Sequence, residues 1–218
     1  MTGDHSVLLQ RGLSKLGIAE NAGLSSRLLA FLVLLSKWNK VYNLTAIRDP
    51  EAMITHHLLD SLSVSTLLSG QRVLDVGTGP GLPGIPLSMA HLQREFVLID
   101  SSAKKTRFIR QAKLEIGLKN VDVIHQRVEQ FENVELFDTI VTRAYSSVEC
   151  ILSSAAHLLR PGGRILAMRG RIAEADEQYA GFRSRIIPVD VPGIAGGRHI
   201  LMMTPDIQEQ EQEQGSGR

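Results

Sequence analysis

The stretch that decides the fold is Arg72-Val73-Leu74-Asp75-Val76-Gly77-Thr78-Gly79-Pro80-Gly81-Leu82-Pro83-Gly84. It begins as a short apolar strand, continues as a glycine-rich turn and ends where a helix begins. Glycines at alternate positions allow a sharp turn and let the backbone approach a ligand, because no Cβ blocks the way. Pro83 and Pro86 fit the first turn of the helix, where a missing N–H costs nothing. This unit predicts a nucleotide site in a doubly wound α/β fold.

The spacing of the glycines distinguishes two kinds of nucleotide. Dinucleotide oxidoreductases carry G-x-G-x-x-G, whose third glycine would fall on Leu82. Here that glycine comes one residue early, at Gly81, and the strand carries an acid, Asp75. An acidic strand end followed by G-x-G-x-G resembles the first motif of S-adenosylmethionine-dependent methyltransferases. An NAD(P)-dependent oxidoreductase, against which Leu82 argues, remains an alternative, as does a tight turn without a ligand.

A second acid supports a nucleoside site. The apolar stretch 95–99 ends in Asp100, nineteen residues after Gly81. An acid at this place can accept hydrogen bonds from both ribose hydroxyls of an adenosine, in either cofactor. Asp100 could also cap the next helix, a role for which Ser101 and Ser102 compete. A non-catalytic RNA-binding protein that had lost its cofactor would be expected to have lost Asp75, Gly77 or Gly79 as well, and all three are present.

Composition narrows the class of protein. The 218 residues suit one domain with a modest extension, and 43% hydrophobic content is ample for a core. No apolar run approaches the roughly 20 residues of a membrane span, and the N-terminus does not resemble a signal peptide. The single Cys150 predicts a reducing, cytoplasmic location. No Cys/His cluster has zinc spacing, and His56 and His57 with Asp60 lack a fourth ligand, so no metal is expected.

Three regions are expected along the chain. Residues 1–70 form an N-terminal helical extension, residues 71–204 the S-adenosylmethionine-binding domain, and residues 205–218 a disordered tail. The extension should contain a helix that stops at Gly17, a longer one capped by Ser25 or Ser26, and a third from Asp49 to about Leu59. The tail carries four acids and one arginine, so the rest of the chain has a net charge of +4, which is compatible with RNA.

From residue 72 strands and helices alternate. Strands are expected near 72–76, 95–99, 121–125, 137–142, 163–168, 185–191 and 199–204, and helices near 83–91, 103–116, 147–159 and, more weakly, 172–182. The first five strands should be parallel by the crossover rule, and the last two, which have no helix between them, should form an antiparallel hairpin at one edge. The fold class is therefore a Rossmann-like class I methyltransferase: a seven-stranded, mostly parallel sheet with a C-terminal hairpin.

With these pieces placed, the chain resembles the small-subunit ribosomal RNA guanine-N7 methyltransferases, once called glucose-inhibited division protein B, over residues 25–204. The resemblance is carried mainly by WNKVYNLT (residues 38–45), HLLDSL (57–62) and the run 75–86, with shorter matches at 127–129, 142–144, 169–170 and 198–199. The family usually has Lys where Arg169 stands and Glu where Gly197 stands.

The resemblance implies an S-adenosylmethionine site contacted by Gly77, Leu82, the Val128–Glu129 segment and Arg143. It also implies methylation of N7 of guanine 527 in 16S rRNA, with the small ribosomal subunit as partner. Together with the residues argued above, the expected cofactor-binding set is Asp75, Gly77, Gly79, Leu82, Asp100, Val128, Glu129 and Arg143.

The chemistry agrees with a guanine N7 target, whose lone pair carries no proton and needs no general base. Arg143 ends the fourth strand, at the rim where ligands gather, and is the expected catalytic residue; it could neutralise the methionine carboxylate or an RNA phosphate, or form an ion pair with a neighbouring acid. Tyr145 could stack on the flipped guanine or pack in the core. The expected RNA-binding residues are Lys40, Tyr145, Arg169 and Arg198.

Overall fold

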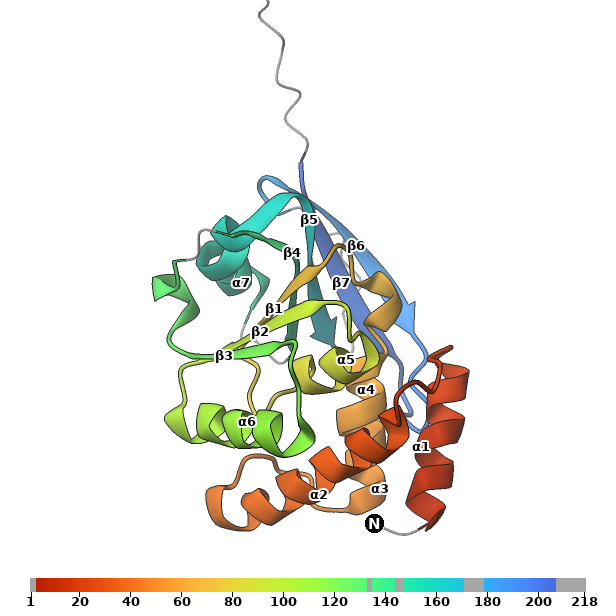
Figure 1. Ribbon diagram of the computed structural model, residues 1–218. Coiled ribbons are helices and arrows are strands. Elements are labelled where there is room, and N and C mark those ends of the chain that lie inside the picture. Colours follow the sequence, from red (N-terminus) through yellow and green to blue (C-terminus); the bar gives the residue numbers. More distant parts are fainter. Residues whose placement is uncertain (1–2, 133–134, 144–146, 171–178, 207–218) are drawn as a thin grey trace, which may run out of the picture.

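The computed structural model describes residues 3–132, 135–143, 147–170 and 179–206. Seven strands form one sheet with the order β3-β2-β1-β4-β5-β7-β6 (Figure 1). Their bounds are β1 (Arg72–Val76), β2 (Glu95–Asp100), β3 (Val121–His125), β4 (Phe137–Arg143), β5 (Leu159–Arg169), β6 (Phe182–Val189) and β7 (Arg198–Pro205). The strands β3, β2, β1, β4 and β5 are parallel, whereas β7 is antiparallel to both β5 and β6. The expected fold class and its C-terminal hairpin are confirmed.

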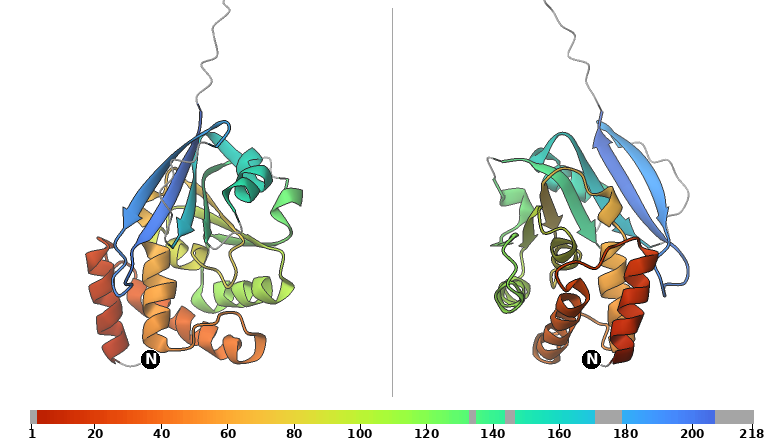
Figure 2. Two further views of the ribbon diagram at one scale, coloured as in Figure 1. Left: turned by 180° about the vertical axis from the view of Figure 1, so that it is seen from behind. Right: turned by 45° about the vertical axis from the view of Figure 1, so that its right-hand side comes forward.

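Helices cover both faces of the sheet. They are α1 (Gly3–Lys15), α2 (Leu24–Tyr42), α3 (Pro50–Met53), α4 (Asp60–Leu62), α5 (Gly84–Ala90), α6 (Ala103–Ile116) and α7 (Val148–Ala155), with a π-helix η1 (Ile54–Leu59) and 3₁₀ turns η2 (Ser65–Leu67), η3 (Val128–Gln130) and η4 (Ala156–Leu158). The helices of the N-terminal extension lie together beside the sheet in each view (Figure 2). Among the described helices, none is long and apolar enough to cross a membrane.

Two hydrophobic clusters lie on the two faces of the sheet, because successive strand residues point to opposite sides. Val73 and Leu98 belong to the larger cluster, whereas Leu74 and Ile99 belong to the smaller one. The larger cluster also takes residues from α1, α2, α5 and α6, and the smaller one from α7 and η3. The N-terminal helices and the sheet thus share one core, as expected for an extension rather than a separate domain.

The start of α2 differs from the expectation. Gly23, with φ of 68°, precedes the helix, and no side chain caps it. Ser25 lies inside the first turn instead, where its N–H and hydroxyl both bond to the carboxylate of Glu20. The serine cap was therefore wrong, because Glu20, five residues upstream, binds both the backbone N–H and the hydroxyl of Ser25.

The third helix begins as expected. The Asp49 side chain accepts a hydrogen bond from Ala52 N at 2.8 Å, and Pro50 occupies the first helical position. The chain then continues through η1 into α4, so the helical stretch ends at Leu62 rather than Leu59. Asp60 consequently lies within a continuous helical segment.

The C-terminal part shows two further differences. The weak helix expected near 172–182 falls mostly outside the described residues, but its last part is wrong, because Tyr179 and Phe182 form a β-bridge across a turn that leads into β6. Pro205 and Asp206, expected in the tail, belong to the sheet edge: Pro205 ends β7 and Asp206 N donates to Gly181 O at 2.9 Å. The rest of the tail lies outside the described residues.

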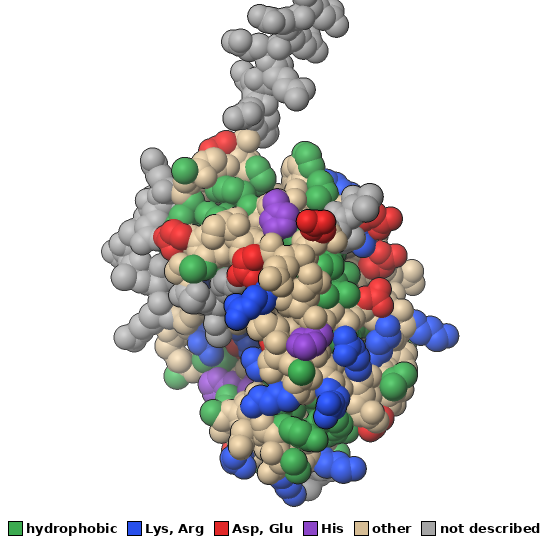
Figure 3. Space-filling view, turned by 90° about the vertical axis from the view of Figure 1, so that its left-hand side faces the viewer, with side chains coloured by type: hydrophobic (Ala, Val, Ile, Leu, Met, Phe, Trp, Pro, Cys, Tyr) green, Lys and Arg blue, Asp and Glu red, His purple; other side chains and the backbone are tan. Residues whose placement is uncertain are grey.

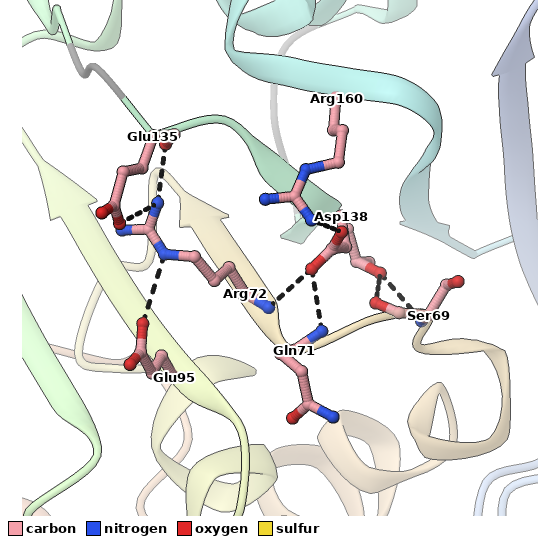
Figure 4. A network of polar contacts seen from close by, with 8 residues as sticks. Ser69, Gln71, Arg72, Glu95, Glu135, Asp138 and Arg160 are labelled. Atoms are coloured by element: carbon pink, nitrogen blue, oxygen red, sulfur yellow. Dashed lines mark hydrogen bonds and ion pairs between the residues drawn. The ribbon is translucent and has the colours of Figure 1, made fainter.

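Asp138 joins the starts of β1 and β5 to β4 (Figure 4). Its Oδ2 accepts from Gln71 N at 2.8 Å and Arg72 N at 2.9 Å, and its Oδ1 accepts from Arg160 Nη1 at 2.7 Å. Burial alone would raise the pKa of Asp138, but the two N–H groups and the Arg160 guanidinium together lower it. A carboxyl whose pKa is lowered by folding stabilises the protein above its ordinary pKa, and this contribution is lost as the pH falls.

We expect Asp138→Ala to lower the free energy of unfolding by about 2–3 kcal/mol near pH 7, since two backbone donors lose a charged acceptor. The difference from wild type should shrink as the pH falls below about 4, because the unfolded chain takes up a proton at the ordinary Asp pKa before the folded carboxylate does. Urea unfolding at pH 7 and pH 3.5 measures both values. Asp122→Ala, which removes an ion pair whose Asp side chain is 78% exposed, is the matched control and should change little. Equal effects of the two substitutions would contradict the prediction.

Candidate functional site

The glycine-rich turn after β1 is held from beneath by Asp75. Its Oδ2 accepts from Thr78 Oγ1 at 2.6 Å and from Gly84 N at 2.7 Å, so one oxygen ties together the two ends of the turn. A Cβ on Gly84 would lie 2.7 Å from the same oxygen, which explains why glycine stands there. Contacts within the protein therefore hold both ends of the turn.

The side chain of Asp75 is fully buried beneath the turn that it contacts. Burial raises the pKa of Asp75 to about 7, against the opposing effects of its bonds to Thr78 and Gly84. Its side chain contacts the turn and is covered from solvent, so it positions the turn from the inside. A direct contact between Asp75 and the cofactor stays a prediction, and the contacts that the structure shows are those with the turn.

Asp100 holds the same turn from the neighbouring strand. Its Oδ2 accepts from Gly79 N at 2.9 Å, its Oδ1 accepts from Ser102 N at 2.8 Å, and Lys105 Nζ lies 3.5 Å from Oδ2. Ser102 is the residue preceding α6 and makes no side-chain cap. Asp100 thus orients the start of α6 and the glycine turn together, and the two roles weighed for it are compatible.

A narrow cleft of about 90 Å³ opens where β1 and β2 end. Gly77, Val128 and Glu129, which are far apart in sequence, all line this cleft, while their contact with the cofactor stays a prediction. The other lining residues are Val76, Ile99, Ser101, Gln126 and Arg127. Leu82 does not line this cleft: it is 2% exposed and its side chain belongs to the larger hydrophobic cluster.

A larger cavity of about 450 Å³ lies at the ends of β4 and β5 and the start of β7. At its wall, Asp60 is shared by two arginines: Arg143 Nη1 lies 3.3 Å from Asp60 Oδ2, and Arg198 Nε donates to Asp60 Oδ1 at 3.0 Å. Arg143 Nη1 also donates to His56 O at 2.9 Å. The ion pair weighed as one role of Arg143 is therefore present.

This corner has an excess of positive charge. Burial lowers the pKa of Arg143, while Asp60 and Asp75 raise it, and an arginine in such a site stays protonated. Two guanidinium groups against one carboxylate leave a net charge of +1, and Arg169 lines the same cavity. The corner is suited to an anionic group of a ligand.

The expected RNA-binding residues are not all brought together. Arg169 and Arg198 line the large cavity, whereas Lys40 is exposed in the last turn of α2 and lines neither the cavity nor the cleft. Tyr145 lies outside the described residues. Among the described residues, no group of three or more His, Cys, Asp or Glu could hold a metal ion.

Sequence reasoning missed the part played by Asp60 and His57. His57 is 4% exposed, its Nε2 lies 2.9 Å from Thr45 Oγ1, and its buried Nδ1 has no partner among the described residues. Burial, and secondarily the nearby Arg143, lowers the pKa of His57 to about 4. The imidazole is therefore neutral at pH 7. Both residues belong to the HLLDSL motif, and this could have indicated that they share a role.

The lowered pKa predicts a pH-dependent stability. The unfolded state binds a proton near pH 6.5 and the folded state only near 4, so stability falls as the pH drops through this window. Between pH 7 and pH 5 we expect His57 to contribute a loss of about 2 kcal/mol. Urea unfolding of wild type and His57→Gln at both values isolates this contribution, which should be absent from the variant and retained in the exposed-residue control His157→Gln. The same pH dependence in all three proteins would rule His57 out as its source.

Comparison with known proteins matches this sequence to one family. A family model described as rRNA small subunit methyltransferase G matches residues 24–200. A protein of Methylococcus capsulatus named ribosomal RNA small subunit methyltransferase G is 50% identical over 204 residues, which cover 93% of this chain and 100% of the relative. A protein of the same name from Nitrosococcus oceani is 45% identical and covers 91% of this chain and 94% of its own length.

The fold has counterparts among solved structures. The crystal structure of a SAM dependent methyltransferase from Aquifex aeolicus superposes with a TM-score of 0.55 at 22% identity, covering 77% of this chain and 97% of that chain. This likeness supports the fold, while the sequence matches identify the family. The chain belongs to the rRNA small subunit methyltransferase G family.

Proposed function

We propose that the protein transfers a methyl group from S-adenosylmethionine to N7 of guanine 527 in 16S rRNA, acting in the cytoplasm on RNA of the small ribosomal subunit. The observation that carries this proposal is the glycine turn, fixed between Asp75 and Asp100, in a chain that belongs to this family. The NAD(P)-dependent oxidoreductase and the RNA-binding protein without a cofactor are the competing functions.

The residues present fit an adenosine-containing methyl donor. Gly77 and Gly79 form a backbone cradle whose φ angles are 65° and 61°, a region that side-chain-bearing residues rarely adopt. Asp100 lies at the rim of the second strand, where its carboxylate retains acceptor capacity beyond the bonds to Gly79 and Ser102. Val128 and Glu129 form the opposite wall of the cleft. S-adenosylmethionine, when bound, supplies a methyl group on a positively charged sulfur.

Arg143 is proposed to hold the anionic end of a ligand. It ends β4, beside the cleft, and lines the large cavity with Arg198 and Arg169. The net positive charge left by the Arg143–Asp60–Arg198 cluster would be balanced by the methionine carboxylate or by an RNA phosphate. The two arginines also stiffen each other, since both are bound to the same carboxylate.

Guanine N7 needs little chemistry from the protein. Its in-plane lone pair carries no proton, so no general base is required, and the task is to orient the base and exclude water. The neutral His57 and the buried Asp75 are consistent with this, because each is committed to a structural contact. Leu82, although expected at the cofactor, would act only by shaping the turn.

Calorimetric titration with S-adenosylmethionine and with NAD separates the three functions. The proposal expects binding of the first and not of the second; NAD binding would favour the oxidoreductase, and binding of neither would favour an RNA-binding protein without a cofactor. Mapping of methylated guanines in 16S rRNA from cells lacking the protein tests the target. A full complement of N7-methylguanine at position 527 in those cells would refute it.

Asp100→Asn should weaken S-adenosylmethionine binding by roughly 10- to 100-fold, because a charged acceptor for the ribose hydroxyls is worth about 1.5–3 kcal/mol. The amide has one acceptor oxygen, which can keep the bond to Gly79 N, whereas its NH2 group cannot accept from Ser102 N. The turn should therefore persist, with a moderate fall in melting temperature. Asp100→Ala, which removes both bonds to the backbone, should lower the melting temperature further. An unchanged dissociation constant in the folded Asn variant would leave Asp100 with a purely structural role.

Arg143→Ala should reduce kcat and kcat/KM together, by roughly 10²-fold, which corresponds to about 2.7 kcal/mol. Folding should survive, because Asp60 keeps Arg198 as its partner. Single-turnover methyl transfer to small-subunit RNA, normalised to folded protein, gives the value. Arg143→Lys, which keeps the charge but loses the planar fork, should recover only part of the rate. If the Ala variant melts early and its folded fraction methylates normally, Arg143 serves only as a structural ion pair.

A further inference from the structure

Helix α6 has a large excess of basic over acidic residues, and the side that packs against the core is apolar. Its sequence, AKKTRFIRQAKLEI, contains five basic residues and one acid. One side is committed to the core through Phe108, Ile109 and Ala112, which are fully buried. The charge therefore gathers on the opposite side, away from the sheet.

Two of the five cations have carboxylate partners. Lys105 pairs with Asp100 at 3.5 Å and Lys113 with Asp122 at 3.2 Å. Lys104, Arg107 and Arg110 are exposed, and among the described residues none of the three forms an ion pair with a carboxylate. Lys104 Nζ and Arg110 Nη2 instead donate to backbone carbonyls at 3.3 Å. These three residues recur every third position, so they follow one another along the helix over roughly 9 Å.

Helix stability does not explain this arrangement. The first turn of α6 contains Lys104 and Lys105 and no acid. The positive end of a helix dipole disfavours cations there and would favour Asp or Glu. The only carboxylate described at this end of α6 is that of Asp100, which pairs with Lys105 and leaves Lys104 without one.

The charged side of α6 adjoins the cleft of about 90 Å³ at the ends of β1 and β2, which we call the donor cleft because it is the proposed site of the methyl donor. A groove of about 390 Å³ runs between α6 and the end of β3, lined by Ala103, Thr106, Arg107, Arg110, Gln111, Leu114 and His125. His125 Nε2 lies 3.1 Å from the carbonyl of Ser101, a residue that lines the cleft. On the other flank, Lys104 bonds to Tyr42 O at the end of α2, where Lys40 occupies the last turn.

Figure 3 shows this side of the molecule. Lys and Arg side chains gather over its lower half, while Asp and Glu side chains lie mainly above them. The surface is thus divided into a basic and an acidic part rather than evenly mixed. A polyanion would be attracted to the basic part and repelled from the acidic one.

We infer that Lys104, Arg107 and Arg110, together with Lys40, form a docking surface for the sugar-phosphate backbone of the substrate RNA, beside the donor cleft and outside the catalytic cavity. This inference rests on the proposed function for the identity of the polyanion. Three observations favour an RNA backbone over an acidic protein segment. The surface is positively charged, it includes two arginines, and it adjoins the donor cleft.

The test is Arg107→Gln/Arg110→Gln in the full-length chain. Binding of transcribed 16S rRNA is measured by filter retention across a KCl series, without methyl donor. We expect the dissociation constant to rise about tenfold at 100 mM KCl, and the slope of log K against log[KCl] to become shallower by about 1.4–1.8, because two phosphate contacts are lost. The affinity for S-adenosylmethionine should be unchanged, which also reports that the variant is folded.

Two variants sharpen the comparison. Arg183→Gln/Arg185→Gln removes the same charge from β6, at the opposite edge of the sheet, and should leave both quantities as in wild type. Arg107→Lys/Arg110→Lys keeps the charge and should retain most of the salt dependence. If the double Gln variant fails to fold, the single variants should each reduce the slope by about 0.7–0.9.

The measured dissociation constant and salt slope show whether α6 binds the RNA backbone. A wild-type dissociation constant and slope in Arg107→Gln/Arg110→Gln, or an equal loss in the β6 control, would overturn it and leave the surface to another partner. Failure of the proposed function is visible separately, because wild-type protein that binds the RNA but does not methylate guanine N7 would refute the function and not the docking surface.

Discussion

Two carboxylates clamp one glycine turn, and the rest of the site depends on this clamp. Asp75 holds Thr78 and Gly84 from below, and Asp100 holds Gly79 from the side. Complete burial raises the pKa of Asp75 to about 7, because its two hydrogen bonds both lie on Oδ2 and only partly replace the lost water, while Oδ1 is buried without a partner among the described residues. Both ends of the turn are nevertheless held by contacts within the protein.

The N-terminal helices complete the site as well as the core. Asp60 comes from α4 of the extension, yet its partners Arg143 and Arg198 end β4 and begin β7. Neither the extension nor the sheet alone would contain this cluster. His57, which is neutral at pH 7, adds no further positive charge. The single carboxylate of Asp60 can therefore hold the two guanidinium groups near each other despite their mutual repulsion.

Sequence periodicity predicted the elements well and their long-range contacts poorly. Strand 72–76 and the hairpin topology follow from apolar runs and crossover rules, which are local or nearly so. The Asp60 pairs span 83 and 138 residues, and no spacing rule connects residues so distant. Likewise, the serine cap on α2 failed because Glu20, outside the capping pattern, competes for the same N–H groups.

The same limit applies to the role of single residues within a motif. Asp75, Gly77 and Leu82 all belong to one glycine-rich stretch, and the pattern alone gives each a place at the ligand. The structure separates them by exposure: Gly77 faces the cleft, Asp75 supports the turn from inside, and Leu82 packs in the core. A motif selects residues for a common geometry, and only some of them need to touch the ligand.

Charge is distributed over this protein for two different tasks. In the cavity, arginines are partly neutralised by Asp60 and held rigid, which suits recognition of one anionic group at a fixed place. On α6, Lys104, Arg107 and Arg110 are exposed and have no carboxylate partner among the described residues, which suits a flexible polyanion that binds through many weak, salt-sensitive contacts. A large RNA needs both, because backbone contacts orient the substrate whereas a fixed site selects the base. The small net charge of the whole chain, +1, conceals this division.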